Sequence, residues 1–210
     1  MVNLSGNDRV EVTYDSGKYE IVFADSFDTL ADEAFKIKQP RKIGIITDSN
    51  VSGLYADTVK DILSAKETQV FVYVVPAGEE NKNLDSVKKI YEFLIENRFD
   101  RKDMLIALGG GVIGDMTGFA AATYLRGVDY IQVPTTLLSM VDSSVGGKTG
   151  VDLGGYKNMV GAFYMPRLVF TNISTLKSLP KRQFASGMGE VLKAGLIKDG
   201  SFYGWIINNL

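Results

Sequence analysis

The chain has 210 residues, of which 45% are apolar and 23% charged, so it has enough apolar residues for a substantial core and does not resemble a disordered chain. A formal net charge of −2 argues against nucleic-acid binding, and no apolar run approaches the roughly 20 residues of a membrane span. Because cysteine is absent and residues 1–7 lack the basic and apolar regions of a signal peptide, we expect a cytoplasmic protein without disulfides.

Histidine is also absent, which limits the chemistry that the chain can perform by itself. General acids and bases must then be Asp, Glu, Lys, Arg or Tyr. A metal ion bound by this chain alone would have only oxygen ligands, an arrangement that suits Mg²⁺ or Ca²⁺ better than Zn²⁺. Glycine is enriched instead, with 22 residues in the whole chain, and it is most crowded between Gly109 and Gly161. Crowded glycines are typical of sharp turns and of close approaches to a ligand.

Short apolar runs alternate with amphipathic segments along most of the chain. The predicted strands are residues 9–15, 19–23, 42–47, 69–75, 104–108 and 130–133, the first two forming a β-hairpin. The predicted helices are residues 27–37, 51–63, 84–95, 112–125 and 183–197. Alternating strands and helices predict an α/β fold with a Rossmann-like, mostly parallel sheet and helices on both faces.

Two stretches depart from this alternation. Residues 139–161 are rich in glycine and read as a weakly structured segment, unusually long for a connector, which favours a functional loop. After Pro180 the pattern is helical only, so we expect one domain over residues 1–179 and the first helices of a second, all-helical domain over residues 180–210. Two helices cannot bury an apolar face without partners, so the sequence is expected to be truncated.

The sequence Gly109-Gly110-Gly111-Val112-Ile113-Gly114-Asp115 follows a predicted strand and opens a predicted helix. Glycines at this place allow the backbone to approach a diphosphate while the helix N-terminus faces its negative charge. The pattern matches G-x-G-x-x-G, but on a later strand than in the usual dinucleotide fingerprint, and a plain strand-to-helix turn is the alternative. The context favours nucleotide phosphate binding.

A second glycine motif, Gly146-Gly147-Lys148-Thr149, looks like the end of a phosphate-binding P-loop. A P-loop requires a glycine five residues before Gly147, where this chain has Asp142, and no strand comes immediately before it. We therefore reject an NTPase interpretation, although Lys148 remains available for a phosphate or a hydroxyl.

Other candidate residues each have a structural alternative. Thr135 and Thr136 follow a predicted strand, where ligands of open α/β sheets bind, but one of them could cap a helix. Arg126 could clamp a phosphate or neutralise the C-terminus of its helix. Glu190 and Lys193 share a helix face, either as an ordinary ion pair or as a carboxylate ligand with a basic neighbour.

Taken in order, these motifs resemble the 3-dehydroquinate synthase family of sugar phosphate cyclases, and the resemblance runs along most of the chain. The matching segments are Gly78-Glu79-x-x-Lys82, Gly109–Asp115, Ala121–Gly127, Pro134–Leu138, Val141–Gly150, Lys157-Asn158, Gly161–Phe163 and Glu190-Val191-x-Lys193. The resemblance implies an NAD-binding α/β domain over residues 1–179 and a helical domain that binds metal and substrate.

The resemblance also implies roles for individual residues. The implied cofactor contacts are Asp48, Asn50, Glu79, Lys82, Gly110, Gly111, Val112, Ile113, Gly114, Asp115, Thr135, Thr136, Asp142, Lys148, Lys157, Thr175, Leu176 and Ser178. The implied catalytic, substrate-facing residues are Arg126, Asp142, Lys148, Asn158, Glu190 and Lys193. Glu190 is in addition the implied ligand of a divalent metal, Zn or Co.

The activity that the resemblance implies is the NAD- and metal-dependent cyclisation of 3-deoxy-D-arabino-heptulosonate 7-phosphate to 3-dehydroquinate, with loss of phosphate. It belongs to the shikimate pathway of aromatic amino acid biosynthesis. The other metal ligands of the family are histidines, which this chain lacks. We therefore expect an incompletely liganded metal and no turnover by this polypeptide alone.

Partners and alternatives follow from the same resemblance. It implies a small sugar phosphate as substrate and a homodimer formed through the N-terminal domain, with no nucleic acid or membrane partner. The alternatives are another sugar phosphate cyclase of the 2-deoxy-scyllo-inosose synthase type, a metal-dependent polyol dehydrogenase, and a non-catalytic NAD-binding module. A dehydrogenase would accumulate NADH and lack the Asp142–Gly150 series.

Overall fold

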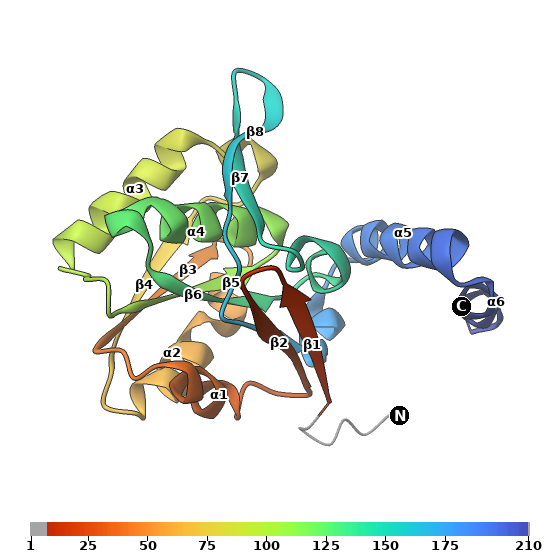
Figure 1. Ribbon diagram of the computed structural model, residues 1–210, viewed down its shortest axis with the longest axis horizontal. Helices are drawn as coiled ribbons and strands as arrows, with labels where there is room; N and C mark the ends of the chain where they lie inside the picture. Colours follow the sequence, from red (N-terminus) through yellow and green to blue (C-terminus); the bar gives the residue numbers. More distant parts are fainter. Residues whose placement is uncertain (1–7, 210) are drawn as a thin grey trace.

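The computed structural model describes residues 8–209, and these form a mixed sheet covered by helices, with two further helices that extend from it (Figure 1). The expectation for residues 1–7 lies outside the described residues. The sheet strands are β1 (Arg9–Tyr14), β2 (Gly17–Ala24), β3 (Lys42–Asp48), β4 (Gln69–Val75), β5 (Met104–Gly109), β6 (Asp129–Pro134) and β9 (Leu168–Asn172). The strand order is β1-β2-β9-β6-β5-β3-β4, and every neighbouring pair is parallel except β1 with β2.

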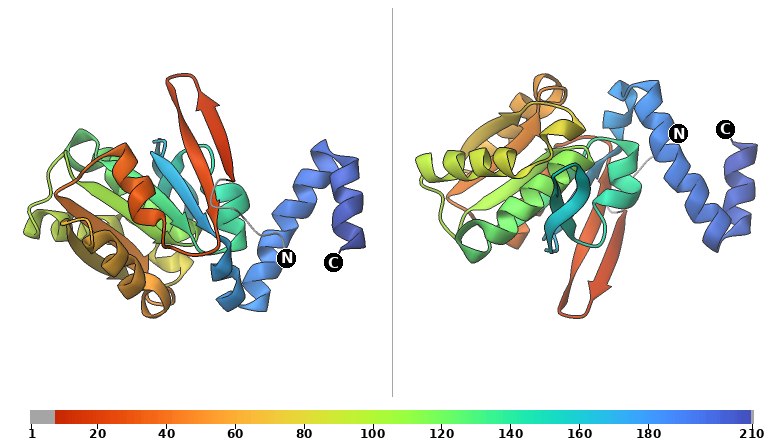
Figure 2. Two further views of the ribbon diagram at one scale, coloured as in Figure 1. Left: turned by 90° about the horizontal axis from the view of Figure 1, so that it is seen from below. Right: turned by 90° about the horizontal axis from the view of Figure 1, so that it is seen from above.

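Helices cover both faces of this sheet, as the sequence predicted (Figures 1 and 2). The α-helices that cover the sheet are α1 (Leu30–Ile37), α2 (Asp57–Ser64), α3 (Leu84–Glu96) and α4 (Gly111–Thr123). Short helices are η1 (Ser52–Ala56), η2 (Glu79–Asn81), η3 (Tyr124–Arg126), η4 (Ser139–Ser143) and η5 (Ile173–Ser178). The Rossmann-like α/β fold is thereby confirmed.

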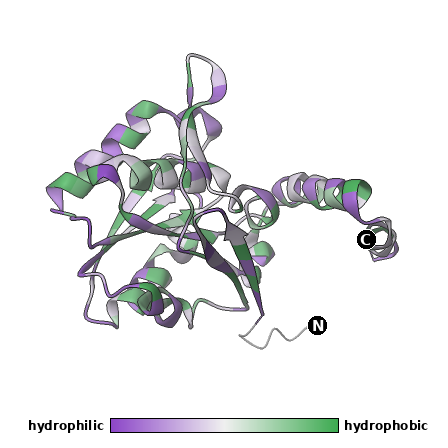
Figure 3. Cartoon of the chain, viewed as in Figure 1, coloured by the Kyte–Doolittle hydropathy of each residue, from purple (hydrophilic) through white to green (hydrophobic). Residues whose placement is uncertain are grey.

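Side chains of the central strand β5 alternate between two cores. Met104, Ile106 and Leu108 pack with α1 and α2 on one face of the sheet. Leu105 and Ala107 pack with α3 and α4 on the other. A parallel strand that is buried on both faces is apolar at every position, which is why residues 104–108 read as a continuous apolar run. Figure 3 shows the resulting hydrophobic stretches on the strands and on the helices that cover them.

Most predicted elements are found close to their expected bounds, with small shifts at their ends. The predicted helix over residues 27–37 begins at Leu30, because Phe27 instead forms a turn in which its carbonyl accepts from the Leu30 amide. Phe27 packs edge-on against Tyr55, with ring centroids 5.7 Å apart. The helix ends before Pro40, as expected from the effect of proline on the preceding residues.

The glycine-rich segment of residues 139–161 is more ordered than predicted. It contains η4 and most of an antiparallel hairpin of β7 (Lys148–Leu153) and β8 (Tyr156–Phe163), so the expectation of a weakly structured loop was wrong. Gly150 and Gly161 are cross-strand partners in this hairpin. Gly150 and Gly161 therefore allow the two strands to approach closely, whereas the positive φ of Gly154 and Gly155 serves the turn of the hairpin.

Strand β9 was not predicted, although it lies between β2 and β6 and completes the sheet. Its residues are all buried, but its purely apolar run is only Leu168–Phe170. A run of three residues is shorter than the four to eight from which a strand is normally recognised.

The last two helices, α5 (Lys181–Lys198) and α6 (Gly200–Asn208), extend away from the sheet (Figures 1 and 2). They confirm the predicted change to helix after Pro180. They leave large apolar side chains exposed, including Leu196, Ile197 and Trp205, and the exposed fraction of Trp205 is 62%. No helix in residues 8–209 is long and apolar enough to cross a membrane.

Candidate active site

The carboxyl ends of β3, β4, β5, β6 and β9 meet at one edge of the sheet because these strands are parallel. The predicted cofactor contacts lie in the segments that follow these five strands. Asp48 ends β3 and Asn50 follows it, after β4 come Glu79 and Lys82, and after β5 come residues 110–115; Thr135 and Thr136 follow β6, and Thr175, Leu176 and Ser178 follow β9. The fold thus brings together residues that are dispersed over about 130 positions of the sequence, at the edge where open α/β sheets bind ligands.

The glycine turn after β5 combines two functions. Gly110 is the N-cap of α4, so the thirteen-residue helix presents its first free amides at this edge of the sheet. Gly114, in contrast, faces the sheet, and a Cβ atom there would lie 2.6 Å from Oε1 of Gln132. The third glycine of the pattern therefore serves helix–sheet packing, and the first turn of α4 remains available for an anion.

The two threonines after β6 differ in their hydrogen bonding. Thr136 Oγ1 accepts from the Ser139 amide at 3.1 Å, so Thr136 forms the cap that the sequence left as one possibility. Thr135 is 4% exposed and its Oγ1 has no hydrogen-bond partner among residues 8–209, while its backbone amide donates to the carbonyl of Gly109 at 3.0 Å. An unpartnered buried hydroxyl next to the glycine turn is a candidate ligand contact.

Local hydrogen bonds shape the segments after β3 and β9. The Asp48 side chain accepts from the amides of Asn50 and Val51 at 2.8 and 3.1 Å, which forms a tight turn at the end of β3. Ser178 hydrogen-bonds to the hydroxyl of Tyr55 and donates to the Thr175 carbonyl at 2.9 Å. These contacts hold η1 and η5 together along the edge.

Lys82, Asp115 and Asn158 form the best-defined polar cluster of the site. Nζ of Lys82 lies 2.6 Å from Oδ2 of Asp115 and donates to Oδ1 of Asn158 at 2.6 Å. Burial raises the pKa of Asp115, and the hydrogen bond from Lys82 opposes that rise. Nearby, Lys157 pairs with Glu79 at 3.1 Å on the surface.

An open cleft of about 550 Å³ lies between α4, η4 and the β7–β8 hairpin. The residues that line it are Asp115, Asp142, Ser143, Lys148, Thr149, Gly150, Asn158, Met159, Gly161, Ala162 and Phe163. Three of the predicted catalytic residues, Asp142, Lys148 and Asn158, are thus brought to one cavity. Lys148 begins a strand and not a helix, which agrees with the rejection of a P-loop.

Helix α5 brings Glu190 and Lys193 towards the same region. Gly187 packs α5 against η4, since a Cβ atom there would lie 2.6 Å from the backbone nitrogen of Leu138. Glu190 and Lys193 form an ion pair, which was one of the two interpretations of their spacing. Hydrogen bonding to Glu190 raises the pKa of Lys193, and the nearby Asp142 carboxylate raises it further.

Arg126 stands apart from the other predicted substrate-facing residues. It follows α4 in η3, whereas the cleft lies at the first turns of that helix. Thirteen residues of α-helix span about 20 Å. Within this chain, Arg126 is exposed and does not join the cleft.

Several residues of the cleft were not singled out from the sequence. Ser143 has a buried Oγ without a hydrogen-bond partner in the described part of the chain, and a Cβ atom on Gly111 would lie 2.9 Å from it. Phe163 and Met159 form an apolar wall on β8. The sequence marked Ser143 and Phe163 only as members of the matching segments Val141–Gly150 and Gly161–Phe163, and Met159 only as part of the glycine-rich stretch. No local pattern shows which side of a hairpin faces a helix.

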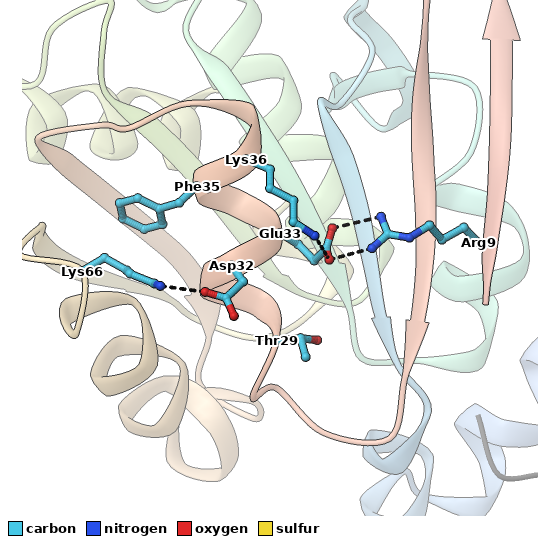
Figure 4. Close-up of a pocket in the computed structure, with 7 residues that line it drawn as sticks. All are labelled: Arg9, Thr29, Asp32, Glu33, Phe35, Lys36 and Lys66. Carbon is cyan, nitrogen blue, oxygen red and sulfur yellow. Dashed lines mark hydrogen bonds and ion pairs between the residues drawn. The ribbon is translucent and has the colours of Figure 1, made fainter. Parts of the chain in front are cut away.

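A second depression of about 550 Å³ lies beside α1, as Figure 4 shows. Its charged residues satisfy one another: Arg9 binds Glu33 through two hydrogen bonds of 2.6 and 3.0 Å, and Lys66 pairs with Asp32 at 2.6 Å. These groups link the β1–β2 hairpin and the turn after α2 to α1, so the depression is a structural feature.

Metal ligands are scarce in the described part of the chain. No three His, Cys, Asp or Glu side chains come together in residues 8–209 in a way that would hold a metal ion. Glu190, the predicted metal ligand, has Lys193 as its partner. This set of residues does not by itself form the catalytic zinc or cobalt site that the resemblance implied, since such sites use at least three protein ligands.

The sheet order, the glycine turn and the cleft define an open, Rossmann-like α/β protein with its candidate site at the carboxyl edge. A family model described as 3-dehydroquinate synthase N-terminal matches residues 72–186. The chain therefore belongs to the 3-dehydroquinate synthase family.

Individual relatives agree with this assignment. A 3-dehydroquinate synthase of Ruminiclostridium cellulolyticum is 47% identical over 191 residues, which are 91% of this chain and 53% of the relative. A solved 2-deoxy-scyllo-inosose synthase, complexed with carbaglucose-6-phosphate, NAD⁺ and Co²⁺, superposes with a TM-score of 0.85 at 29% identity and covers 90% of this chain and 52% of its own. A 2-epi-5-epi-valiolone synthase from Streptomyces hygroscopicus with NAD⁺ and Zn²⁺ bound gives a TM-score of 0.80 at 28% identity over 91% and 53% of the two chains. The chain spans about half the length of the relatives it matches.

Proposed function

We propose that this chain provides the NAD-binding half of a 3-dehydroquinate synthase, which converts a seven-carbon keto-acid phosphate to 3-dehydroquinate with release of phosphate. The observation that carries the proposal is the glycine turn at Gly110, which opens α4 beside the unpartnered hydroxyl of Thr135. This edge combines helix amides for a diphosphate with a free hydroxyl, and it fits a dinucleotide. The identity to curated 3-dehydroquinate synthases supports the reaction.

Different residues along this edge of the sheet would bind different parts of the cofactor. The first turn of α4, with Gly110 and Gly111, would bind the diphosphate, while the Thr135 hydroxyl would donate to or accept from the cofactor. Bound NAD would supply a hydride acceptor that is restored at the end of each turnover. Because NAD would then remain bound between turnovers, an edge with contacts from five strand ends would suit it.

The cleft residues would act on the substrate. Lys148 would neutralise charge on the departing phosphate, and Asp142 and Asn158 would orient hydroxyl groups of the sugar chain. Lys193, beside Glu190 on α5, would hold or release the proton of a carbinol that is oxidised. No step is assigned to a metal, because residues 8–209 do not supply a complete set of ligands.

We further propose that residues 1–179 form the NAD-binding domain and that residues 180–210 form the first helices of a helical domain. Exposed apolar residues on α5 and α6, such as Trp205, support this division. The chain alone is then expected to bind NAD but to release no phosphate from substrate in the presence of Zn²⁺ or Co²⁺.

Two measurements test the proposal in sequence. In isothermal titration calorimetry, the chain should bind one NAD⁺ per polypeptide, and ATP should not compete. Binding of ATP in place of NAD⁺, or of neither, would contradict the nucleotide assignment. Phosphate release by the chain alone at the rate of a complete family member would contradict the expected inactivity.

A second candidate is another sugar phosphate cyclase, favoured by the TM-score of 0.85 to 2-deoxy-scyllo-inosose synthase. The two are distinguished by joining this chain to the part of the Ruminiclostridium cellulolyticum relative that it does not match. The heptulosonate phosphate should then be turned over without accumulation of NADH, and a hexose 6-phosphate should not. Accumulation of NADH would instead support a dehydrogenase, and NAD⁺ binding without turnover a non-catalytic module.

A further inference from the structure

Lys82 is the one buried lysine in residues 8–209, with 5% of its surface exposed. It follows η2, and its ammonium group contacts side chains from two other elements, Asp115 on α4 and Asn158 on β8. Both distances are 2.6 Å. A buried lysine is unfavourable unless it is paired, so this arrangement is a specific feature of the site and not a by-product of packing.

The main chain around Lys82 is tied to the same hairpin. The Lys82 carbonyl accepts from the Asp152 amide at 2.9 Å, and Oδ1 of Asp152 accepts from the Asn158 amide at 2.7 Å. Asn158 has a φ of 56°, a left-handed conformation that asparagine tolerates better than most residues. Lys82, Asp152 and Asn158 are therefore held in one closed set of contacts between the loop before α3 and the β7–β8 hairpin.

The chemistry of an ammonium group decides how its partners are oriented. An ammonium group only donates hydrogen bonds, so Asn158 must present its carbonyl oxygen to Lys82 and keep its Nδ2 donor for another partner. Asp115 likewise uses Oδ2 for Lys82 and keeps Oδ1 as an acceptor. Asp115 and Asn158 both line the cleft, whereas Lys82 does not.

We propose that Lys82 is a positioning residue, which acts through Asp115 and Asn158 and presents a carboxylate acceptor beside an amide donor to a ligand in the cleft. Such a pair fits a hydroxyl group, which donates to Asp115 and accepts from Asn158, and hence a polyol. This role goes beyond the direct cofactor contact that the family resemblance implied for Lys82, which stays a prediction. The polyol identity rests on the proposed function, whereas the positioning of the two side chains does not.

The charges around Asp115 agree with this role. Burial raises the pKa of Asp115, and Glu79 and Asp142 raise it further, while the ammonium of Lys82 is the group that opposes them. Without Lys82, the Asp115 carboxyl would hold its proton to higher pH and donate where the ligand needs an acceptor.

The test compares three variants of the full chain without any ligand. Lys82→Met removes the ammonium group, Asn158→Gly keeps the positive φ but removes the acceptor, and Lys88→Met is the control. Lys88 is exposed on α3, and its nearest acid, Glu92, is 3.8 Å away. The readouts are the pKa of the Asp115 carboxyl from carbon-detected NMR and the hydrogen exchange of backbone amides in residues 156–160.

We expect Lys82→Met to raise the pKa of Asp115 and to speed exchange in residues 156–160 by about tenfold, because a charged hydrogen bond is lost. Asn158→Gly should speed exchange similarly but leave the pKa of Asp115 much less changed, and Lys88→Met should change neither. Unchanged exchange and pKa in Lys82→Met would overturn the proposal. If Lys82→Met does not fold, unchanged exchange in Asn158→Gly would overturn it.

NAD⁺ titration separates this proposal from the proposed function. If the unmodified chain binds no NAD⁺, the cofactor assignment fails, while the ligand-free pKa and exchange measurements still decide the role of Lys82. If it binds NAD⁺, the affinity of the Lys82→Met variant for NAD⁺ should depend on pH in a way that follows the raised pKa of Asp115. The same dependence of affinity on pH in the variant and in the unmodified chain would contradict the positioning of Asp115 by Lys82.

Discussion

Gly150 of β7 lies directly opposite Gly161 of β8, and a Cβ atom on Gly150 would lie 2.6 Å from the carbonyl oxygen of Val160. No side chain separates the two strands at this point. The hairpin can therefore fold tightly beside α4 and form one wall of the cleft.

A methyl group at Gly150 should loosen this hairpin. Gly150→Ala is expected to lower the free energy of unfolding by about 1–3 kcal/mol, because the contact is with main chain that cannot rotate away. Gly53→Ala is the matched control, since a Cβ atom there meets nothing within 4 Å, and it should leave stability unchanged or slightly raised. Thermal unfolding of both variants checks this, and equal melting temperatures would contradict the close approach.

The same glycines explain where sequence patterns failed for the fold. Buried parallel strands such as β5 have an apolar residue at every position and were predicted with nearly the observed bounds. Strand β8 instead has exposed residues along most of its length, and its glycines suggested a loop. A local pattern does not distinguish a glycine that turns the chain from one that permits a neighbouring strand, because the difference lies in the partner.

For the candidate site, the sequence predicted which segments meet, but not which polar atoms lack a hydrogen-bond partner and can contact a ligand. The ends of parallel strands must share an edge, so the glycine turn and the threonines after β6 could be placed together. Whether Thr135 or Thr136 caps a helix depends on the path of the chain after β6. The contact between Lys82 and Asn158 joins residues that are 76 positions apart, and no spacing rule predicts it.

The two threonines after β6 provide a paired test of cofactor binding. Thr135→Val removes a hydroxyl without a partner, so it should leave stability unchanged or raised and weaken NAD⁺ binding. Thr136→Val removes a cap and should lower the free energy of unfolding by about 1 kcal/mol. Calorimetric titration gives the NAD⁺ affinity of each variant, and thermal unfolding gives its stability. Undiminished NAD⁺ affinity in Thr135→Val would show that the Thr135 hydroxyl does not contact the cofactor.

Helix α5 offers a test of how Glu190 is placed. Gly187 contacts Leu138 closely, whereas a Cβ atom on Gly189, two residues further along, meets nothing within 4 Å. Gly187→Ala should displace α5 and speed hydrogen exchange in η4, while Gly189→Ala should stabilise the helix by about 1 kcal/mol. Equal exchange of η4 in both variants would show that Gly187 does not position Glu190.

The ion pair of Arg9 and Glu33 makes stability depend on pH. The hydrogen bonds from Arg9 hold the pKa of Glu33 below its ordinary value of 4.5, against a smaller opposing effect of burial. Because the folded pKa is the lower one, this stabilisation is present above pH 4.5 and is lost as the pH falls through the folded pKa. Glu33→Gln should therefore cost about 1–3 kcal/mol at neutral pH, and this difference should shrink in acid.

Urea unfolding of both proteins from neutral pH to about pH 3 measures this difference. The control is Glu11→Gln, which removes an exposed partner of Lys18 on the same hairpin and should change stability little at any pH. Arg9 is the group that connects the β1–β2 hairpin to α1, since it binds Glu20 on β2 at 2.8 Å as well as Glu33. The free energies of unfolding of Glu33→Gln and of the unmodified chain could instead differ by the same amount at every pH. That result would show that this connection does not depend on the Glu33 charge.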